Sequence, residues 1–457
     1  MKQKLITFLL LCATSAMAYA GGIVTNSNQS TQYVRMLARD ASTSIDAVYY
    51  NPAGLTRLAD GFHVSLSNQS IFQKKTIENT YPYLNEKKYV GDVVVPAFPD
   101  LYLAYKKEKL AIGFGFQPNA GGGTAKFDTG LPSFEIPYAS IPTILSAMFG
   151  AGFCENYSAD IQFEGSSVFW GAQLNASYAI NEIVSASLGA RMVFAKNTYK
   201  GHIKDIMIDP KHPLLNPSGG LMSASAFFTA AGNAAYAAMT SDQEVDVEQT
   251  GFGYTPILGL SLNLGEKLNI GMKYEFRTKL ELENDTKKDL VVPQFADGAK
   301  VRSDVPALLS VGATYKILPQ MRISGGFHYF FDKNATIEKA PGVEKDIDGN
   351  MYEISVGGEY DITEKILISA GYLYARTGVG TGYQTDLSHS LTSSTVGFGG
   401  EFKVTEKLDL NLGMLYTMYT SDAKNSSYTL PSTQVINYKE TYNRTNIDFS
   451  IGFTYHF

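Results

Sequence analysis

Apolar and polar side chains alternate along almost the whole chain beyond residue 60. Side chains of a β-strand point alternately to its two faces, so this period of two predicts a succession of strands. In residues 269–282, alternation places charged residues, from Lys273 to Glu281, on one face of the predicted strand and apolar residues, from Ile270 to Leu282, on the other. The last alternating segment spans residues 446–457, and its apolar face consists of Ile447, Phe449, Ile451, Phe453, Tyr455 and Phe457.

Two kinds of connection join these segments. Short polar turns occur at residues 106–109, 181–182, 265–267, 319–320, 363–365 and 405–407. Longer connections lie between them, at roughly 74–97, 118–165, 201–250, 284–304, 334–349, 377–390 and 421–441. Six tight turns and seven long connections join 14 strands and place both chain ends on the tight-turn side. Short turns on one rim and long loops on the other are typical of bacterial outer-membrane barrels.

The direction of the alternation favours a membrane barrel over a soluble β-sandwich, which also alternates. The charged faces suit a polar lumen, the apolar faces suit lipid, and Tyr and Phe stand at the strand ends, where aromatic girdles form. Outside the N-terminal segment, only residues 221–240 approach the length of a membrane helix, and polar residues interrupt them. We therefore predict an all-β fold, a 14-stranded antiparallel transmembrane β-barrel.

The first 60 residues lack this alternation. Residues 1–20 have a basic start, an apolar run and the small-residue pattern that ends at Ala20, which predicts a secretory signal peptide. Residues 61–457 form the predicted barrel. Cleavage after Ala20 would leave Cys154 as the only cysteine, so no internal disulfide is expected.

Residues 21–60 are too apolar for a solvated tail, although a disordered tail is the alternative. They carry charged residues that could pair with a lumen wall, and a barrel of this size encloses room for an occupant. We therefore expect an N-terminal plug inside the barrel. The charged residues are Arg35, Arg39, Asp40, Asp46 and Arg57.

One stretch of this plug carries a family resemblance. Residues 46–55 read Asp-Ala-Val-Tyr-Tyr-Asn-Pro-Ala-Gly-Leu, and Pro52 and Gly54 predict a rigid turn after Asn51. Asn51, Pro52 and Ala53 match an Asn-Pro-Ala motif, and with the alternating chain behind it the sequence resembles the FadL/TodX family of outer-membrane transporters for hydrophobic compounds. The resemblance implies an N-terminal plug in a 14-stranded barrel, a gating movement near residues 51–54, substrate capture by loop helices, and lateral exit at a kinked strand.

Two long connections contain apolar segments with helical composition, at residues 141–149 and 221–239. Exposed apolar surface of this kind predicts a ligand site, unless the helices cover one another as a lid. The candidate ligand-binding residues are Ile144, Leu145, Met148, Phe149, Phe227, Phe228 and Tyr236. The third strand is the candidate for the kink, because Gly113 and Gly115 face inward there and Pro118 follows.

The composition indicates neither an enzyme nor a nucleic-acid-binding protein. The formal net charge of −6 offers no basic field. The six histidines show no metal-ligand spacing, no Gly-x-Ser-x-Gly is present, and the run 121–126 lacks the Gly-Lys-Ser/Thr order of a phosphate loop. We expect no cofactor, no metal and no catalytic residue.

The resemblance implies passive import of hydrophobic small molecules, such as long-chain fatty acids, across the bacterial outer membrane. Expected partners are an amphipathic or hydrophobic ligand, outer-membrane lipids and the barrel-assembly machinery, which would read the C-terminal strand ending at Phe457. A monomer is expected. The alternatives are a surface adhesin or structural barrel whose long loops bind another protein, and a polar porin.

Overall fold

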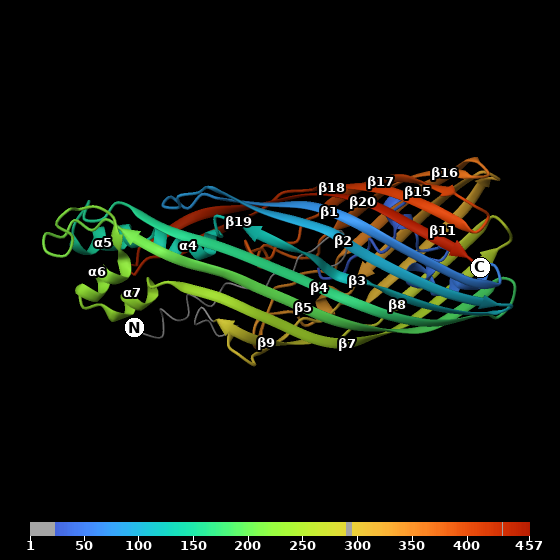
Figure 1. Cartoon of the computed structure of the whole chain (residues 1–457), viewed down its shortest axis with the longest axis horizontal. Helices are drawn as coiled ribbons and strands as arrows, with labels where there is room; N and C mark the ends of the chain where they lie inside the picture. Colours follow the sequence, from blue (N-terminus) through green and yellow to red (C-terminus); the bar gives the residue numbers. More distant parts are fainter. Residues whose placement is uncertain (1–22, 289–294, 432) are drawn as a thin grey trace.

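The computed structural model describes residues 23–288, 295–431 and 433–457, which form a closed antiparallel barrel (Figure 1). Each long strand pairs with the next, and the last pairs with the first, with His63 opposite His456 and Asn79 opposite Glu440. Closure leaves none of these strands as an open edge of the sheet, as a wall in lipid requires. The described residues contain 14 barrel strands, which confirms the predicted fold. They are β1 (Gly61–Asn79), β2 (Lys88–Lys107), β3 (Leu110–Phe127), β4 (Tyr157–Ala179), β5 (Val184–Ile208), β7 (Gln243–Leu264), β8 (Leu268–Glu275), β11 (Leu308–Leu318), β12 (Met321–Phe330), β15 (Tyr352–Thr363), β16 (Ile366–Arg376), β17 (Ser393–Lys403), β18 (Leu408–Tyr419) and β20 (Val435–His456).

Short elements extend the wall at the loop end. Strands β6 (Met222–Ser223), β9 (Glu281–Lys288), β10 (Lys300–Arg302) and β19 (Asp422–Thr429) join the main sheet, and β13 (Glu338–Ala340) pairs with β14 (Val343–Glu344). The loop helices are α4 (Pro132–Ala139), α5 (Ile141–Phe149), α6 (Ala224–Ala230) and α7 (Ala234–Met239), and a 3-10 turn, η4, spans Asp332–Asn334. None of the helices in the described ranges is long and apolar enough to cross a membrane.

The outer face of β20 is apolar, as its sequence predicts. Phe449, Ile451 and Phe453 are exposed on the outside, whereas Asp448 and Ser450, which alternate with them, are buried toward the lumen. Tyr455 and Phe457 end this face at the turn side, next to Phe62 of β1. An apolar band ending in aromatic side chains matches the surface that outer-membrane barrels present to lipid.

Four of the seven long connections are shorter than predicted because their strands continue beyond the apolar band, whereas those between β8 and β11, β12 and β15, and β16 and β17 are longer. β1 runs to Asn79 and β2 starts at Lys88, so the first connection comprises only residues 80–87 instead of 74–97. In this region the outward residues are polar, for example Lys74, which pairs with Asp92. A strand that is polar on its outer face loses the contrast on which the sequence pattern depends.

The predicted strand 269–282 is also corrected. β8 ends at Glu275, and residues 276–280 leave the regular ladder before β9 begins. The pairing with β7 shifts by one residue across this break, so Leu280 turns into the lumen and Lys279 turns outward. A one-residue slip exchanges the two faces of a strand, which simple alternation along the sequence cannot reveal.

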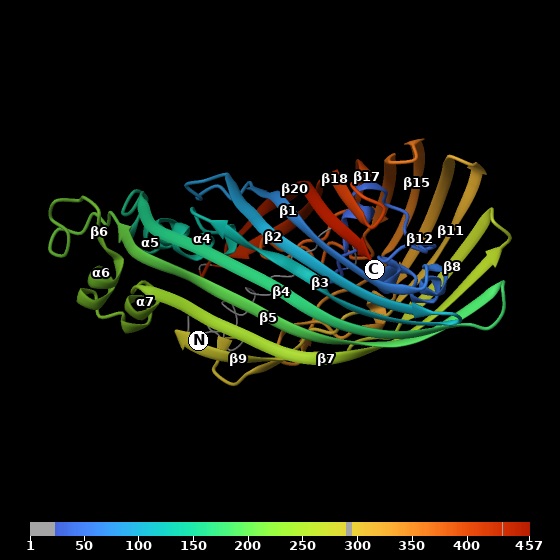
Figure 2. The same cartoon turned by 45° about the vertical axis from the view of Figure 1, so that its right-hand side comes forward.

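The N-terminal segment fills the turn-side half of the lumen, in dark blue near the C-terminus in Figure 2. It contains α2 (Thr31–Arg35), α3 (Ala47–Tyr50) and the 3-10 helix η2 (Pro52–Arg57). The side chain of Ser30 caps α2 by accepting a hydrogen bond from the Tyr33 amide at 3.0 Å. This arrangement confirms the predicted plug. The predicted signal peptide, and with it Gly21, lies outside the described residues.

Candidate functional site

The turn at residues 51–54 is packed too tightly for other residues. Asn51 is fully buried, and its Nδ2 donates to the carbonyl oxygen of Ser42 at 2.9 Å. A β-carbon added at Gly54 would lie 2.3 Å from that same oxygen and 2.6 Å from Asn51 Nδ2. Only glycine therefore fits beside the Asn51 side chain, which links the motif to the preceding plug segment.

Wall residues hold the plug backbone around this turn. Ser177 Oγ donates to the carbonyl of Pro52 at 2.7 Å, and Ala53 is completely buried. Asn175 Nδ2 and Gln173 Nε2 donate to the carbonyl of Val48 at 2.9 and 2.7 Å. Strand β4 thus holds this part of the plug through three side chains that donate to its backbone carbonyls.

Ion pairs tie the plug to the opposite wall. Arg35 Nη1 lies 2.7 Å from Glu359 and Arg35 Nη2 lies 3.2 Å from Glu401, on β15 and β17. Arg39 pairs with Asp46 inside the plug at 2.7 Å. Buried pairs of this kind add little net stability, but removing one partner is costly.

A histidine bridges plug and wall. His328 Nε2 lies 2.7 Å from Asp40 of the plug, and His328 Nδ1 lies 2.7 Å from Glu353 of the wall. Two carboxylates facing both ring nitrogens are satisfied only by a doubly protonated ring that donates twice. Of the five charged plug residues, Arg35, Arg39 and Asp40 pair with wall side chains, while Arg57 donates to the carbonyl of Glu182.

The wall breaks beside the plug, between β2 and β3. The register passes from Val93 opposite Ala125 to Leu101 opposite Phe116, and residues 94–100 and 117–124 do not pair with each other. Against β4, strand β3 carries two extra residues, Asn119 and Gly122. Extra residues bend a strand and interrupt its ladder.

The bent segment rests on the plug. Asn26 donates from its amide to the carbonyl of Asn119 at 2.8 Å, and Gln29 Nε2 donates to the carbonyl of Pro118 at 3.0 Å. Gly121 and Gly122 take φ values of 64° and 128°, which other residues rarely adopt. The glycine run that superficially resembles a phosphate loop is the sequence signal of this bend.

The predicted kink residues separate into two groups. Pro118 lies in the bend, but Gly113 and Gly115 lie below it in regular pairing with Ala104 and Tyr102. β-Carbons added at these glycines would contact Leu55 and Val48 of the plug. The two glycines therefore allow the plug to approach the wall.

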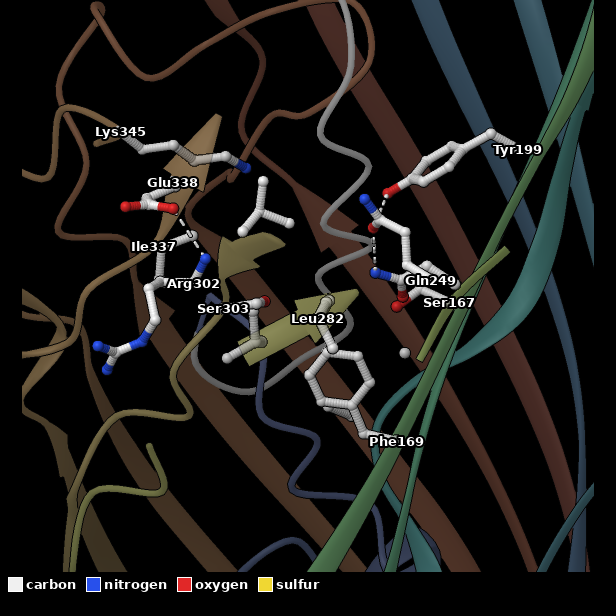
Figure 3. A pocket seen from close by; sticks show the side chains of 15 residues that line it. Ser167, Phe169, Tyr199, Gln249, Leu282, Arg302, Ser303, Ile337, Glu338 and Lys345 are labelled. Atoms are coloured by element: carbon white, nitrogen blue, oxygen red, sulfur yellow. Dashed lines mark hydrogen bonds between the residues drawn. The ribbon is translucent and has the colours of Figure 1, made fainter. Parts of the chain in front are cut away.

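A cavity in the lumen adjoins the bend (Figure 3). Its lining combines Gly121 of the bend with side chains from strands and connections far apart in the sequence, including Phe169, Tyr199, Leu282, Ile337 and Lys345. Tyr199 donates to Gln249 Oε1 at 3.3 Å on one side, and the ammonium of Lys345 points toward the cavity from the other. Sequence reasoning missed this cavity, because no local pattern indicates which lumen residues meet.

Lys345 is one of two basic residues that line this cavity, together with Arg302. Its Nζ donates to Ser388 Oγ at 3.0 Å and lies 4.8 Å from the centre of the Tyr383 ring. Burial disfavours the charged form and lowers the pKa of Lys345 to about 7.

The two predicted apolar loop segments are helical, as α5 and as α6 with α7. Leu145, Phe227 and Phe228 are buried in one cluster, and Tyr236 packs on Phe228 with ring centres 5.0 Å apart. Ile144 is buried in a different cluster toward the lumen. Met148 and Phe149 are 66% and 59% exposed at the tip. None of these seven residues lines the cavity of Figure 3, and Leu145, Phe227, Phe228 and Tyr236 pack in one apolar cluster.

Comparisons place this architecture among known proteins. The family model described as outer membrane protein transport protein (OMPP1/FadL/TodX) matches residues 166–457. No curated protein matches the sequence. A FadL homologue from Pseudomonas aeruginosa is similar in structure, with a TM-score of 0.66 and 12% identity over 97% of this chain and 100% of that one.

Two toluene transporters are also similar in structure. TodX from P. putida has a TM-score of 0.57 and 13% identity over 92% of this chain and 98% of its own. TbuX from Ralstonia pickettii has a TM-score of 0.53 and 15% identity over 91% and 94%. At these identities the structures show a shared fold. Because the family model covers more than half of the sequence, the chain belongs to the outer-membrane transport protein family OMPP1/FadL/TodX.

Proposed function

We propose that this protein is a multi-pass barrel of the bacterial outer membrane that lets hydrophobic small molecules enter the cell passively. Molecules would land at the loop end, pass into the lumen cavity and leave sideways through the break between β2 and β3. The family membership supports transport of hydrophobic compounds. Two structural neighbours are named toluene transporters, so aromatic hydrocarbons and longer aliphatic compounds are both candidate substrates.

One observation carries this proposal: the cavity, the wall break and the plug share a residue. Gly121 lines the cavity and belongs to the bend of β3, and its carbonyl accepts a hydrogen bond from Asn26 Nδ2 of the plug at 2.7 Å. A small movement of the plug would therefore change the cavity and the bend together. The process needs no bond making or breaking, so we assign no enzymatic step.

Deleting Asn119 and Gly122 together tests this route. The deletion would restore a continuous ladder between β3 and β4 and leave only a one-residue mismatch with β2. We expect the barrel to assemble and uptake of a hydrophobic tracer to fall to the level of cells without the protein. Uptake is measured in cells at matched surface abundance, and assembly by heat-modifiable migration on gels.

The matched control deletes Gly219 and Gly220, two residues in the connection between β5 and β6, where an added β-carbon at Gly219 meets nothing within 4 Å. This variant should transport normally. Normal uptake by the Asn119 and Gly122 deletion would show that molecules do not leave through the β3 break.

The packed lid favours a second candidate, a surface adhesin. α5, α6 and α7 cover one another, while Met148 and Phe149 are exposed at the tip. Replacing both tip residues with Ser should leave uptake unchanged if they serve only adhesion, and should slow uptake if they first capture the substrate. Adhesion of cells to host or neighbouring-cell proteins, compared before and after the replacement, separates the two functions.

A further inference from the structure

A row of charged side chains crosses the outer face of the wall beyond the apolar band. The residues of this row lie directly opposite one another in successive strand pairs, and their charges alternate in sign from strand to strand. Opposite charges on directly opposite residues stabilise a strand pair, so a ladder that only holds the sheet together is the simplest explanation. From β1 to β9 the row consists of Lys74, Asp92, Lys126, Glu164, Lys200, Asp246 and Lys288.

The middle of the row does not form such a ladder. Lys200 of β5 lies opposite Glu164 of β4 on one side and Asp246 of β7 on the other. Among the described residues, however, none of these three side chains has an opposite charge within ion-pair distance. The next lysine of the row, Lys126, pairs with Asp128 at 2.7 Å instead of with Glu164. One ammonium group and two carboxylates are therefore open to a ligand.

The three side chains border an open depression of about 280 Å³ on the outside of β4, β5 and β7. Lys200 is exposed, whereas the preceding residue, Tyr199, lines the lumen cavity, so the depression and the transport cavity lie on opposite sides of the wall. Basic and acidic groups are equally numerous around the depression, which suits a ligand that carries both anionic groups and cations. These groups are Lys126, Lys200, Lys288, Glu164, Glu244 and Asp246.

The height of the depression above the apolar band decides which lipids can reach it. The outermost aromatic side chains of this band on β4, β5 and β7 are Trp170, Phe194 and Phe252, which lie opposite one another. Lys200 comes six residues after Phe194, about 20 Å along the strand and, at the usual tilt of a barrel strand, about 15 Å above the band. Phospholipid headgroups extend only about 5–8 Å beyond the hydrocarbon, so they do not reach Lys200.

A lipid that reaches the depression needs a tall, hydrophilic headgroup that carries anionic groups. A chain of several sugars with phosphate groups meets this requirement, because a phosphate oxygen accepts charge-assisted hydrogen bonds from Lys200. Divalent cations that neutralise the other phosphates bind oxygen ligands, which Glu164 and Asp246 supply. These two residues lie two strand spacings apart, about 10 Å, so each carboxylate binds a cation of its own.

We propose that Lys200, Glu164 and Asp246 bind the phosphorylated sugar headgroup of an anionic glycolipid in the outer leaflet. Lys200 binds a phosphate directly, and the two carboxylates bind further phosphates through divalent cations. This inference rests on the proposed outer-membrane location and is independent of transport. It gives the tall wall of β4, β5 and β7 a lipid partner above the apolar band. No bond is formed or broken in this step.

The test measures lipid binding to the purified protein in non-ionic maltoside micelles with magnesium present. The probes are lipopolysaccharide that retains its core sugars, and phosphatidylglycerol. In Lys200→Gln, lipopolysaccharide binding should weaken about 5-fold, as expected for one lysine at an anionic surface, while phosphatidylglycerol binding is unchanged. Lys200→Arg keeps the charge and should keep most of the affinity. The matched control is Lys267→Gln, because Lys267 is exposed in the tight turn between β7 and β8 at the opposite rim.

A second variant tests the cations. Replacing magnesium with EDTA should weaken lipopolysaccharide binding to the wild-type protein. In the double variant Glu164→Gln and Asp246→Asn, this difference between magnesium and EDTA should shrink, because the carboxylates that bind the cations are gone. An equal difference in wild-type protein and double variant would refute the role of the two carboxylates.

The remaining outcomes separate the glycolipid site from a structural ladder and from transport. Unchanged lipopolysaccharide binding in Lys200→Gln, an equal loss for both lipids, or no binding to wild-type protein would refute the site. Displacement of lipopolysaccharide by millimolar inorganic phosphate would refute it in favour of a site for free anions. Uptake of a hydrophobic tracer should be unchanged in every variant, so refutation of this site leaves the proposed function standing. Heat-modifiable migration confirms that every variant is folded.

Discussion

Single side chains hold the plug in place. Asn51 is the clearest case, because one amide joins the Asn-Pro-Ala turn to Ser42 across a segment of the plug that forms no regular ladder. Its role is local, whereas the barrel is specified by alternating strands and tight turns. A change at Asn51 should therefore affect the gate and leave the wall intact.

We predict that Asn51→Ala assembles normally but transports less. The variant leaves the Ser42 carbonyl without its buried donor, which costs about 1–3 kcal/mol of local stability. Uptake in cells at matched surface abundance should fall, while ligand affinity of the purified protein is nearly unchanged. Loss of both would assign the turn a structural role, and loss of neither would make it incidental to gating.

Arg35 provides a second test at the residue scale. Arg35→Met leaves Glu401 and part of Glu359 without their buried partner, although Arg322 still contacts Glu359 at 2.9 Å. We expect a cost near the lower end of the 3–5 kcal/mol found for breaking buried pairs. The plug should become sensitive to protease, and ion conductance in planar bilayers should rise.

The control for this variant removes an exposed ion pair. Lys196 pairs with Glu248 at 2.7 Å, but both side chains are well exposed, at 55% and 37%. Lys196→Gln should cost at most about 1 kcal/mol and leave the plug protected. Equal behaviour of the two variants would mean that ion pairs do not hold the plug.

At the scale of elements, strand β20 combines three environments: lipid, lumen and plug. Phe449 points outward with 46% exposure. Ser450 points inward and lies against the plug, with its Oγ 2.5 Å from Thr31 Oγ1. Alternation alone predicts that Ser450 tolerates a large charged residue, but the plug makes that position crowded.

We predict that Phe449→Arg destabilises the barrel by about 2–4 kcal/mol if the site lies near the bilayer midplane. The suitable control is Asn443→Arg, which lies on the same outer face of β20 beyond the apolar band and should cost less than about 1 kcal/mol. Reversible unfolding in lipid vesicles measures both. Equal costs would place the apolar band elsewhere on the strand.

The boundaries of strands show which structural features the sequence pattern can predict and which it cannot. The run of glycines at 121–123 and Pro118 indicate irregularity, and β3 bends there. The break after Glu275 carries no comparable signal, because charged and apolar residues continue to alternate through it. The local pattern predicts that residues are in strands, but partner strands decide where an extra residue is accommodated.

At the scale of the whole molecule, the barrel should be an outer-membrane protein with Gly21 as its mature N-terminus. N-terminal sequencing of protein purified from membranes checks the cleavage site, and a shift in gel migration on heating checks the barrel. Recovery as a soluble periplasmic protein would contradict the localisation, and a different first residue would contradict only the cleavage site.

The sequence by itself determined the fold class, the strand number, the tight turns and the presence of a plug. Each depends on short-range features: the period of two, the turn residues between strands, and a stretch of 40 residues without alternation. The Asn-Pro-Ala motif added the resemblance to the FadL/TodX family. These signals do not depend on which distant segments of the chain come into contact.

Only the tertiary structure decided which residues meet across the lumen. Lys75 and Arg444 come from opposite ends of the chain and face each other because β1 and β20 close the barrel. The packing of α5, α6 and α7 into one apolar cluster is likewise decided by the tertiary structure, since the same apolar helices would suit an open groove. Contacts between distant segments depend on the register between strands and on closure of the barrel. The alternation along one strand gives no information about either.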